Sequence, residues 1–113
     1  MGIGLATKER MVYDPQNGLP ANVSFNNAKP PTYLDVPLHM GTAAVDIADP
    51  QNPVGTKGAG EPVMGSAASA LICAISDALD GHYFNRTPIM IDMIVNAAAG
   101  QTQSHKPLQV NTY

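Results

Sequence analysis

The stretch Gly55–Gly65, GTKGAGEPVMG, places a single carboxylate, Glu61, among four glycines. Glycines let the backbone approach a bulky ligand closely, and Pro62 limits motion directly behind the carboxylate. A carboxyl group held in a dry pocket has a raised pKa, so it can accept a proton near neutral pH. The residue types therefore indicate a general base on a glycine loop. The simpler interpretation, a solvated glycine turn, stays open.

The same glycines do not form a phosphate-binding loop. Gly55 and Gly60 have the outer spacing of a P-loop, but Glu61-Pro62 stands where Lys and Ser or Thr are needed. A carboxylate at that point would also repel phosphate. The dinucleotide-binding pattern fails as well, because Val63 occupies the third glycine position.

The other residues that commonly do chemistry are scattered. His39, His82 and His105 lack the short spacing of a metal site, so we expect solvated or packed side chains and no metal ligands. Cys73 lies in an apolar helical pattern and is expected to be a buried small hydrophobe rather than a nucleophile. A single cysteine also excludes an iron–sulfur cluster held by this chain alone.

The composition limits both the core and the partners. The 113 residues make one domain at most, and 44% are apolar but only 5% aromatic, so we expect a partner to complete the core. A net charge of -3 offers no basic face for nucleic acid and no polybasic membrane patch. The N-terminal residues show no secretion or lipidation signal, so the cytoplasm is the default location.

The elements before the glycine loop read as short strands. Met11–Tyr13 and Ala21–Phe25 flank a cluster of turn formers and predict a hairpin. A proline-rich loop over Asn26–Pro37 follows, and Gly41–Asp49 predicts a further strand.

The elements after the loop read as helices. Ser66 can cap a helix to about Leu79 that is apolar nearly all round, as in a helix buried inside a larger body, and too short for a membrane span. Thr87 and Pro88 then predict the start of a second helix with its body over Ile89–Ala98, followed by a tail at 99–113. The predicted class is α+β: a short hairpin and strands with long loops, then two helices.

One segment of the sequence resembles a known family over its whole length. Pro53–Leu79 closely resembles the C-terminal segment of the molybdenum-binding subunit of the xanthine dehydrogenase and aldehyde oxidase family, where a G-x-K-G-x-G-E-P loop precedes an alanine-rich helix. The family's run before the loop is similar to GIGLATKERMVYD, GLPANVSF and PPTYLDVP, and its closing helix to RTPIMIDMIVNA. The resemblance covers about Gly4–Ala98 and implies a fold that is part of a larger molybdenum-binding domain.

The resemblance implies an oxidoreductase that hydroxylates an aldehyde or N-heterocyclic substrate with water as the oxygen source. The loop glutamate, here Glu61, acts as the base in that family, and Gly58, Ala59 and Gly60 match the loop backbone beside the molybdenum–pterin cofactor. The implied partners are a larger molybdenum-binding chain, an iron–sulfur subunit and often a flavin subunit carrying FAD, which accept the electrons.

The family's molybdenum-binding subunit is several times longer than this sequence. Met1-Gly2 stands where a Gln-Gly pair is common, and Ile89 replaces a usual Glu, a difference expected to concern surface details. The expectation is a split-off C-terminal subunit or a fragment that cannot catalyse alone. Two alternatives stay open: a non-catalytic structural or assembly subunit, and an inactive truncated product.

Overall fold

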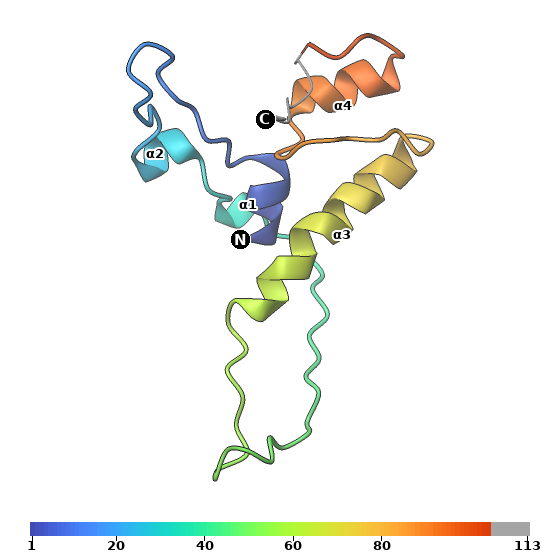
Figure 1. The fold of residues 1–113 in the computed structure, drawn as a ribbon. Coiled ribbons are helices and arrows are strands. Elements are labelled where there is room, and N and C mark those ends of the chain that lie inside the picture. The colour runs from blue at the N-terminus through green and yellow to red at the C-terminus, as the bar shows by residue number, and fades with distance from the viewer. Residues whose placement is uncertain (105–113) are drawn as a thin grey trace, which may run out of the picture.

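The computed structural model describes residues 1–104, which form helices joined by long loops (Figure 1). None of these residues forms a strand or sheet, so the predicted α+β class is wrong. The elements in chain order are α1 (Gly2–Thr7), α2 (Phe25–Ala28), the 3-10 helix η1 (Tyr33–Asp35), α3 (Pro62–Ala78) and α4 (Ile91–Ala98).

The predicted hairpin is reduced to a hydrogen-bonded turn. Ala21 N–H donates to the Val12 carbonyl at 2.8 Å, and Tyr13 and Pro20 form an isolated antiparallel bridge. The pairing does not extend, because Val12 N–H donates to the Asn22 side chain at 3.1 Å instead of to the Ala21 carbonyl, and Phe25 already begins α2. A turn with one bridge is therefore all that the alternating pattern produces.

The predicted strand at 41–49 lies in the long loop between η1 and α3, which projects away from the helices in Figure 1. Within the described part of the chain, residues 37–48 make no hydrogen bond. A strand needs a neighbouring strand to pair with, and this chain places none beside the segment. The strand predicted at 41–49 therefore does not form within residues 1–104.

The start of α3 is earlier than the Ser66 cap predicted. Pro62 takes the first helical position, where its fixed φ and missing N–H cost nothing, and Met64 N–H donates to the Glu61 carbonyl at 2.9 Å. At the other end Gly81, with φ of 80°, donates its N–H to the Ser76 carbonyl at 2.9 Å. The predicted glycine stop is therefore close to where the helix closes.

The start of α4 is later than predicted, at Ile91 instead of the Thr87-Pro88 cap. Ile89 N–H donates to the Ala6 carbonyl at 2.7 Å, and the Ile89 side chain is 1% exposed. This tertiary bond holds the residue outside a helix. The position expected to concern surface details is thus part of the core.

The core is small. Phe84, Ile89 and Met93 form a buried cluster, and side chains of α3 and α4 pack partly against it. Ala6, the other buried apolar side chain of the described residues, lies on α1, which packs along α3. Partly buried neighbours of the cluster are Ile72, Ile75, Leu79, Met90, Ile94 and Ala97.

Much apolar surface stays exposed. α3 contains no buried residue, and Cys73 is exposed, so its predicted burial is wrong for this chain. The radius of gyration is 18.2 Å, whereas a compact domain of this size has about 13 Å. The open shape agrees with the expectation that large parts of the core come from a partner.

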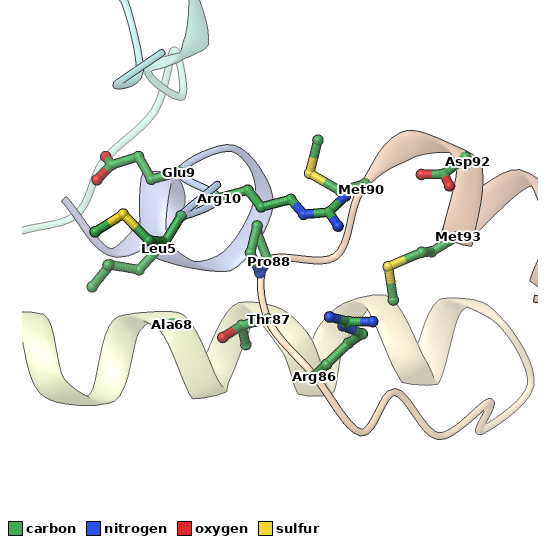
Figure 2. A pocket seen from close by; sticks show the side chains of 11 residues that line it. Leu5, Glu9, Arg10, Ala68, Arg86, Thr87, Pro88, Met90, Asp92 and Met93 are labelled. Carbon is green, nitrogen blue, oxygen red and sulfur yellow. The ribbon is translucent and has the colours of Figure 1, made fainter. Parts of the chain in front are cut away.

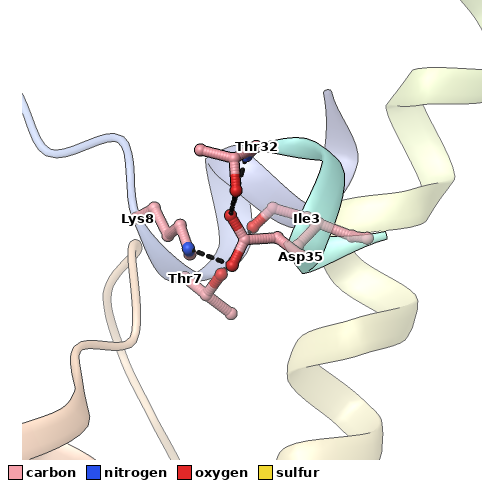
Figure 3. A network of polar contacts seen from close by, with 5 residues as sticks. All are labelled: Ile3, Thr7, Lys8, Thr32 and Asp35. Carbon is pink, nitrogen blue, oxygen red and sulfur yellow. Dashed lines mark hydrogen bonds and ion pairs between the residues drawn. The ribbon is translucent and has the colours of Figure 1, made fainter. Parts of the chain in front are cut away.

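A polar network ties η1 to α1 (Figure 3). The Lys8 ammonium pairs with one oxygen of the Asp35 carboxylate, while the N–H and hydroxyl of Thr32 donate to the other oxygen at 2.7 and 3.0 Å. These hydrogen bonds, the one from Lys8 foremost, lower the pKa of Asp35 from 3.8 to about 2. The long loop after η1 therefore begins at an anchored point.

Candidate functional site

Glu61 sits at the junction between the long loop and α3. Its backbone is already helical, with φ of -72° and ψ of -31°, and serves as the N-cap residue of α3. Its side chain is exposed and makes no hydrogen bond or ion pair to the described residues. The carboxylate thus takes no part in holding this chain together, and it lies at the positive end of the α3 dipole.

The four glycines of the loop do different things. Gly55 has φ of 72°, and a Cβ there would lie 3.1 Å from the Ala48 Cβ, so a turn requires this glycine. Gly65 lies within α3. Gly58 and Gly60 are neither strained nor crowded, since a Cβ at either would meet nothing within 4 Å. Gly58 and Gly60, like Gly65 in the helix, therefore lack a structural reason within residues 1–104.

The turn that contains Gly55 closes the tip of the long loop. Asp49 N–H donates to the Gly55 carbonyl at 3.0 Å, and Gly55 N–H donates to the Asn52 carbonyl at 2.9 Å. The Asn52 amide donates to the Thr56 carbonyl at 2.8 Å. The tip is therefore ordered immediately before the segment that carries Gly58, Ala59 and Gly60.

The predicted site residues are together in space because they are adjacent in sequence. Gly58, Ala59, Gly60 and Glu61 are all exposed, and none of their backbone N–H groups donates a hydrogen bond to the described residues. The dry pocket that a general base needs is not supplied by residues 1–104. The roles predicted for these four residues stay predictions.

The remaining candidates are dispersed. His39 is exposed, while His82 is partly buried and packs edge-to-face on Phe84 with ring centroids 4.6 Å apart. His105 lies outside the described residues. No group of three potential metal ligands occurs within residues 1–104.

A pocket of about 520 Å³ lies between α1, α3 and the segment 86–93 (Figure 2). Four charged residues line it: Glu9, Arg10, Arg86 and Asp92. Figure 2 shows Arg10, just after α1, reaching toward Met90. None of the lining residues belongs to the glycine loop, so the pocket and Glu61 are separate features.

Sequence reasoning did not single out Arg10 or Arg86. They are far apart in the chain, and each is flanked by residues with no recognisable spacing. Only the packing of the segment 86–93 beside α1 brings them to one pocket. Both charge signs line the pocket in equal number, so it favours no simple anion or cation.

Among residues 1–104, none of the helices combines the length and apolar character needed to cross a bilayer.

Three curated proteins resemble this sequence, although no protein-family model matches it. The chain is similar to parts of dehydrogenase subunits. It is 31% identical over 106 residues to the 6-hydroxypseudooxynicotine dehydrogenase complex subunit gamma of Paenarthrobacter nicotinovorans, covering 93% of this chain and 13% of that protein. It is 36% identical over 89 residues to the putative xanthine dehydrogenase molybdenum-binding subunit XdhA of Escherichia coli K12, covering 79% of this chain and 12% of that protein.

The xanthine dehydrogenase molybdenum-binding subunit of Escherichia coli O157:H7 gives the same 36% identity over 89 residues. The chain spans about one eighth of the length of the curated relatives it matches. The resemblance is therefore confirmed at a coarse level: the relatives are dehydrogenase subunits, and two are named for molybdenum binding. The substrate and the role of Glu61 are not addressed by this likeness.

Proposed function

We propose that this chain is part of a molybdenum-dependent oxidoreductase of the xanthine dehydrogenase and aldehyde oxidase type, in which Glu61 is the general base. A larger molybdenum-binding chain completes the active site. The observation that carries the proposal is Glu61 itself: its carboxylate is exposed, has no partner within residues 1–104, and follows an uncrowded glycine loop. The similarity to molybdenum-binding subunits supports the same assignment.

The loop fits one edge of a molybdenum–pterin cofactor. Gly58 and Gly60 leave open space where side chains would stand, and the backbone N–H groups of residues 58–60 are available as donors. When bound, the cofactor supplies the redox centre that takes electrons from the substrate. Residues 58–60 then donate hydrogen bonds toward it, and their lack of bulk admits its close approach.

Glu61 accepts the proton of the water that supplies the new oxygen. In this chain the carboxylate is solvated, so its basicity must be set by the surface that covers it. Burial against a larger chain removes water from the carboxylate, which raises a carboxyl pKa toward the range useful for a base at neutral pH. The proposal therefore requires assembly before catalysis.

The substrate class proposed is an aldehyde or an N-heterocycle. Electrons leave through iron–sulfur clusters, and FAD where a flavin subunit is present, on partner chains. The single cysteine of this chain agrees with clusters held elsewhere.

The test is Glu61→Gln in the assembled complex, purified through a tag on this chain from its own host. Turnover of a panel of purines and aromatic aldehydes is measured with an artificial electron acceptor. Loss of a general base lowers kcat by roughly 100- to 10,000-fold, with molybdenum content and subunit composition unchanged. Asp77→Asn on the exposed surface of α3 is the matched control and should keep full activity.

An unchanged rate in the Glu61→Gln complex would favour the alternative of a structural or assembly subunit with no base. An Asp77→Asn complex that loses activity equally would show that loss of any carboxylate disturbs the assembly. Retained molybdenum in both variants separates a chemical defect from a loading defect.

A further inference from the structure

The segment 37–48 offers an unpaired backbone to a partner. It lies in the long loop between η1 and α3, and no residue in it makes a hydrogen bond within the described part of the chain. Loops of this length without secondary structure are uncommon in compact domains and are usually functional or await a partner. The first question is whether the side chains suit a strand.

The side chains of 43–48 alternate as in a strand at the edge of a sheet. In an extended chain Ala43, Val45 and Ile47 fall on one face, while Ala44 and Asp46 fall on the other. Val45 is 83% exposed and Ile47 68% exposed, so the apolar face is uncovered in this chain. Residues 43–48 thus have the pattern of a half-buried strand, but residues 1–104 form no sheet that would bury it.

Hydrogen-bonded structure flanks the segment on both sides. Before it, the contacts of Asp35 with Lys8 and Thr32 fix η1 to α1. After it, the hydrogen bond from Asp49 N–H to the Gly55 carbonyl closes the loop tip. The anchored start of the loop and the ordered turn after the segment both reduce the conformational entropy that the segment loses when it binds.

We infer that residues 42–48 add as a strand to an open sheet edge of a larger partner chain. In β-strand addition the main chain supplies the hydrogen bonds and alternate side chains fill pockets. The inference rests on the proposed function for the identity of that partner, the chain that holds the molybdenum cofactor. About seven eighths of each relative has no counterpart in this sequence, which leaves ample structure to supply the sheet.

The charges argue against a second copy of this chain as the occupant. Asp46 lies in the middle of the segment and Asp49 at its end. Antiparallel pairing about Asp46 would set the two Asp46 carboxylates opposite one another, and in-register parallel pairing would set Asp46 beside Asp46 and Asp49 beside Asp49. Like charges directly opposite destabilise a strand pair. A sheet edge of different sequence avoids that repulsion.

Strand addition also has a consequence for the site. The turn that ends in Gly55 links the segment to the stretch of loop that contains Gly58, Gly60 and Glu61. Pairing of 42–48 with the partner therefore restricts where Glu61 can lie on that partner's surface.

The experiment compares backbone hydrogen exchange at residues 42–48 in the full chain alone and in the assembly purified through its tag. Strand addition slows alternate amides by roughly 100-fold in the assembly, because every second N–H points to the partner. A proline series at Ala43, Ala44, Val45 and Asp46 adds a second signature. Proline at a position whose N–H points to the partner weakens retention of the larger chain roughly tenfold. Proline at a position whose N–H points away from the partner leaves retention unchanged.

Equal exchange in the free chain and the assembly would overturn the inference. So would four proline variants that behave alike, since docking through side chains alone has no period of two along the backbone. Protection in an assembly that contains only copies of this chain would overturn the choice of partner. The Glu61→Gln variant should keep both signatures, so loss of its catalytic role and loss of strand addition are read separately.

Discussion

The contact between α1 and α3 gives the sharpest test of the fold. Gly2 is buried against Ala67, and a Cβ added to Gly2 would overlap the Ala67 Cβ. The same added atom would lie 3.3 Å from the Ala67 carbonyl carbon and 3.4 Å from its Cα. The Ala67 methyl group is therefore the atom that forbids a side chain at Gly2.

The magnitude follows from that geometry. Gly2→Ala forces the helices apart, and overpacking of this kind costs about 1 to 3 kcal/mol of the free energy of unfolding. Ala67→Gly alone costs about 1 kcal/mol through its lower helix propensity. The double variant Gly2→Ala/Ala67→Gly should also cost only about 1 kcal/mol, because the new methyl group then meets contacts near ordinary distances.

Urea unfolding followed by far-ultraviolet circular dichroism measures these free energies. The matched control is Gly65→Ala in α3, where a Cβ meets nothing within 4 Å. That change should stabilise the chain by up to about 1 kcal/mol, since alanine is the better helix former. If the double variant loses the full sum of the single losses, or if Gly2→Ala behaves as Gly65→Ala does, α1 does not lie on α3 at Ala67.

Two further predictions concern the core and the anchor of the long loop. Ile89→Ala should lower the free energy of unfolding by about 2 to 5 kcal/mol, because Ile89 is the largest fully buried side chain of the described residues. Ile91→Ala, at a residue 78% exposed, should change it by no more than about 0.5 kcal/mol. Equal losses in urea unfolding would contradict the described core. The pKa of Asp35 is lowered from 3.8 to about 2 in the folded chain, so its stabilising effect is complete above pH 3.8 and is lost as the pH falls toward 2. The thermal midpoint of wild type should exceed that of Asp35→Asn by a constant amount above about pH 4, and the difference should shrink below that pH and close as the pH falls through about 2. A gap that does not narrow in acid would mean that the ion pair with Lys8 is absent.

The exposed apolar surface and the proposed base have a common explanation in assembly. α3 has no buried residue, and the carboxylate of Glu61, the N-cap residue of α3, has no partner within residues 1–104. A larger chain that covers α3 would bury the apolar helix and at the same time exclude water from the Glu61 carboxylate. The same cover would make the chain's stability depend on its partner.

Local features could be predicted from the sequence because their hydrogen bonds close within a few residues. Turn formers before Gly18 produce a turn in which Gly18 N–H donates to the Asp14 carbonyl at 2.8 Å. Gly81 is expected to stop the helix before it, and the apolar run that follows Ser66 is helical, although α3 begins at Pro62 and not at the predicted Ser66 cap. The resemblance to molybdenum-binding subunits could likewise be stated from the order of residues alone, and two of the relatives are named for molybdenum binding.

The tertiary structure alone decided the features that depend on distant residues. The strand pattern of 41–49 yields no strand, because pairing requires a neighbour that residues 1–104 do not supply. Ile89 leaves the predicted helix because its N–H bonds to Ala6, far away in sequence, and Cys73 is exposed because nothing in the described chain covers its face of α3. Sequence patterns indicate which faces of a helix or strand are apolar, whereas only the arrangement of the whole assembly determines which residues cover those faces.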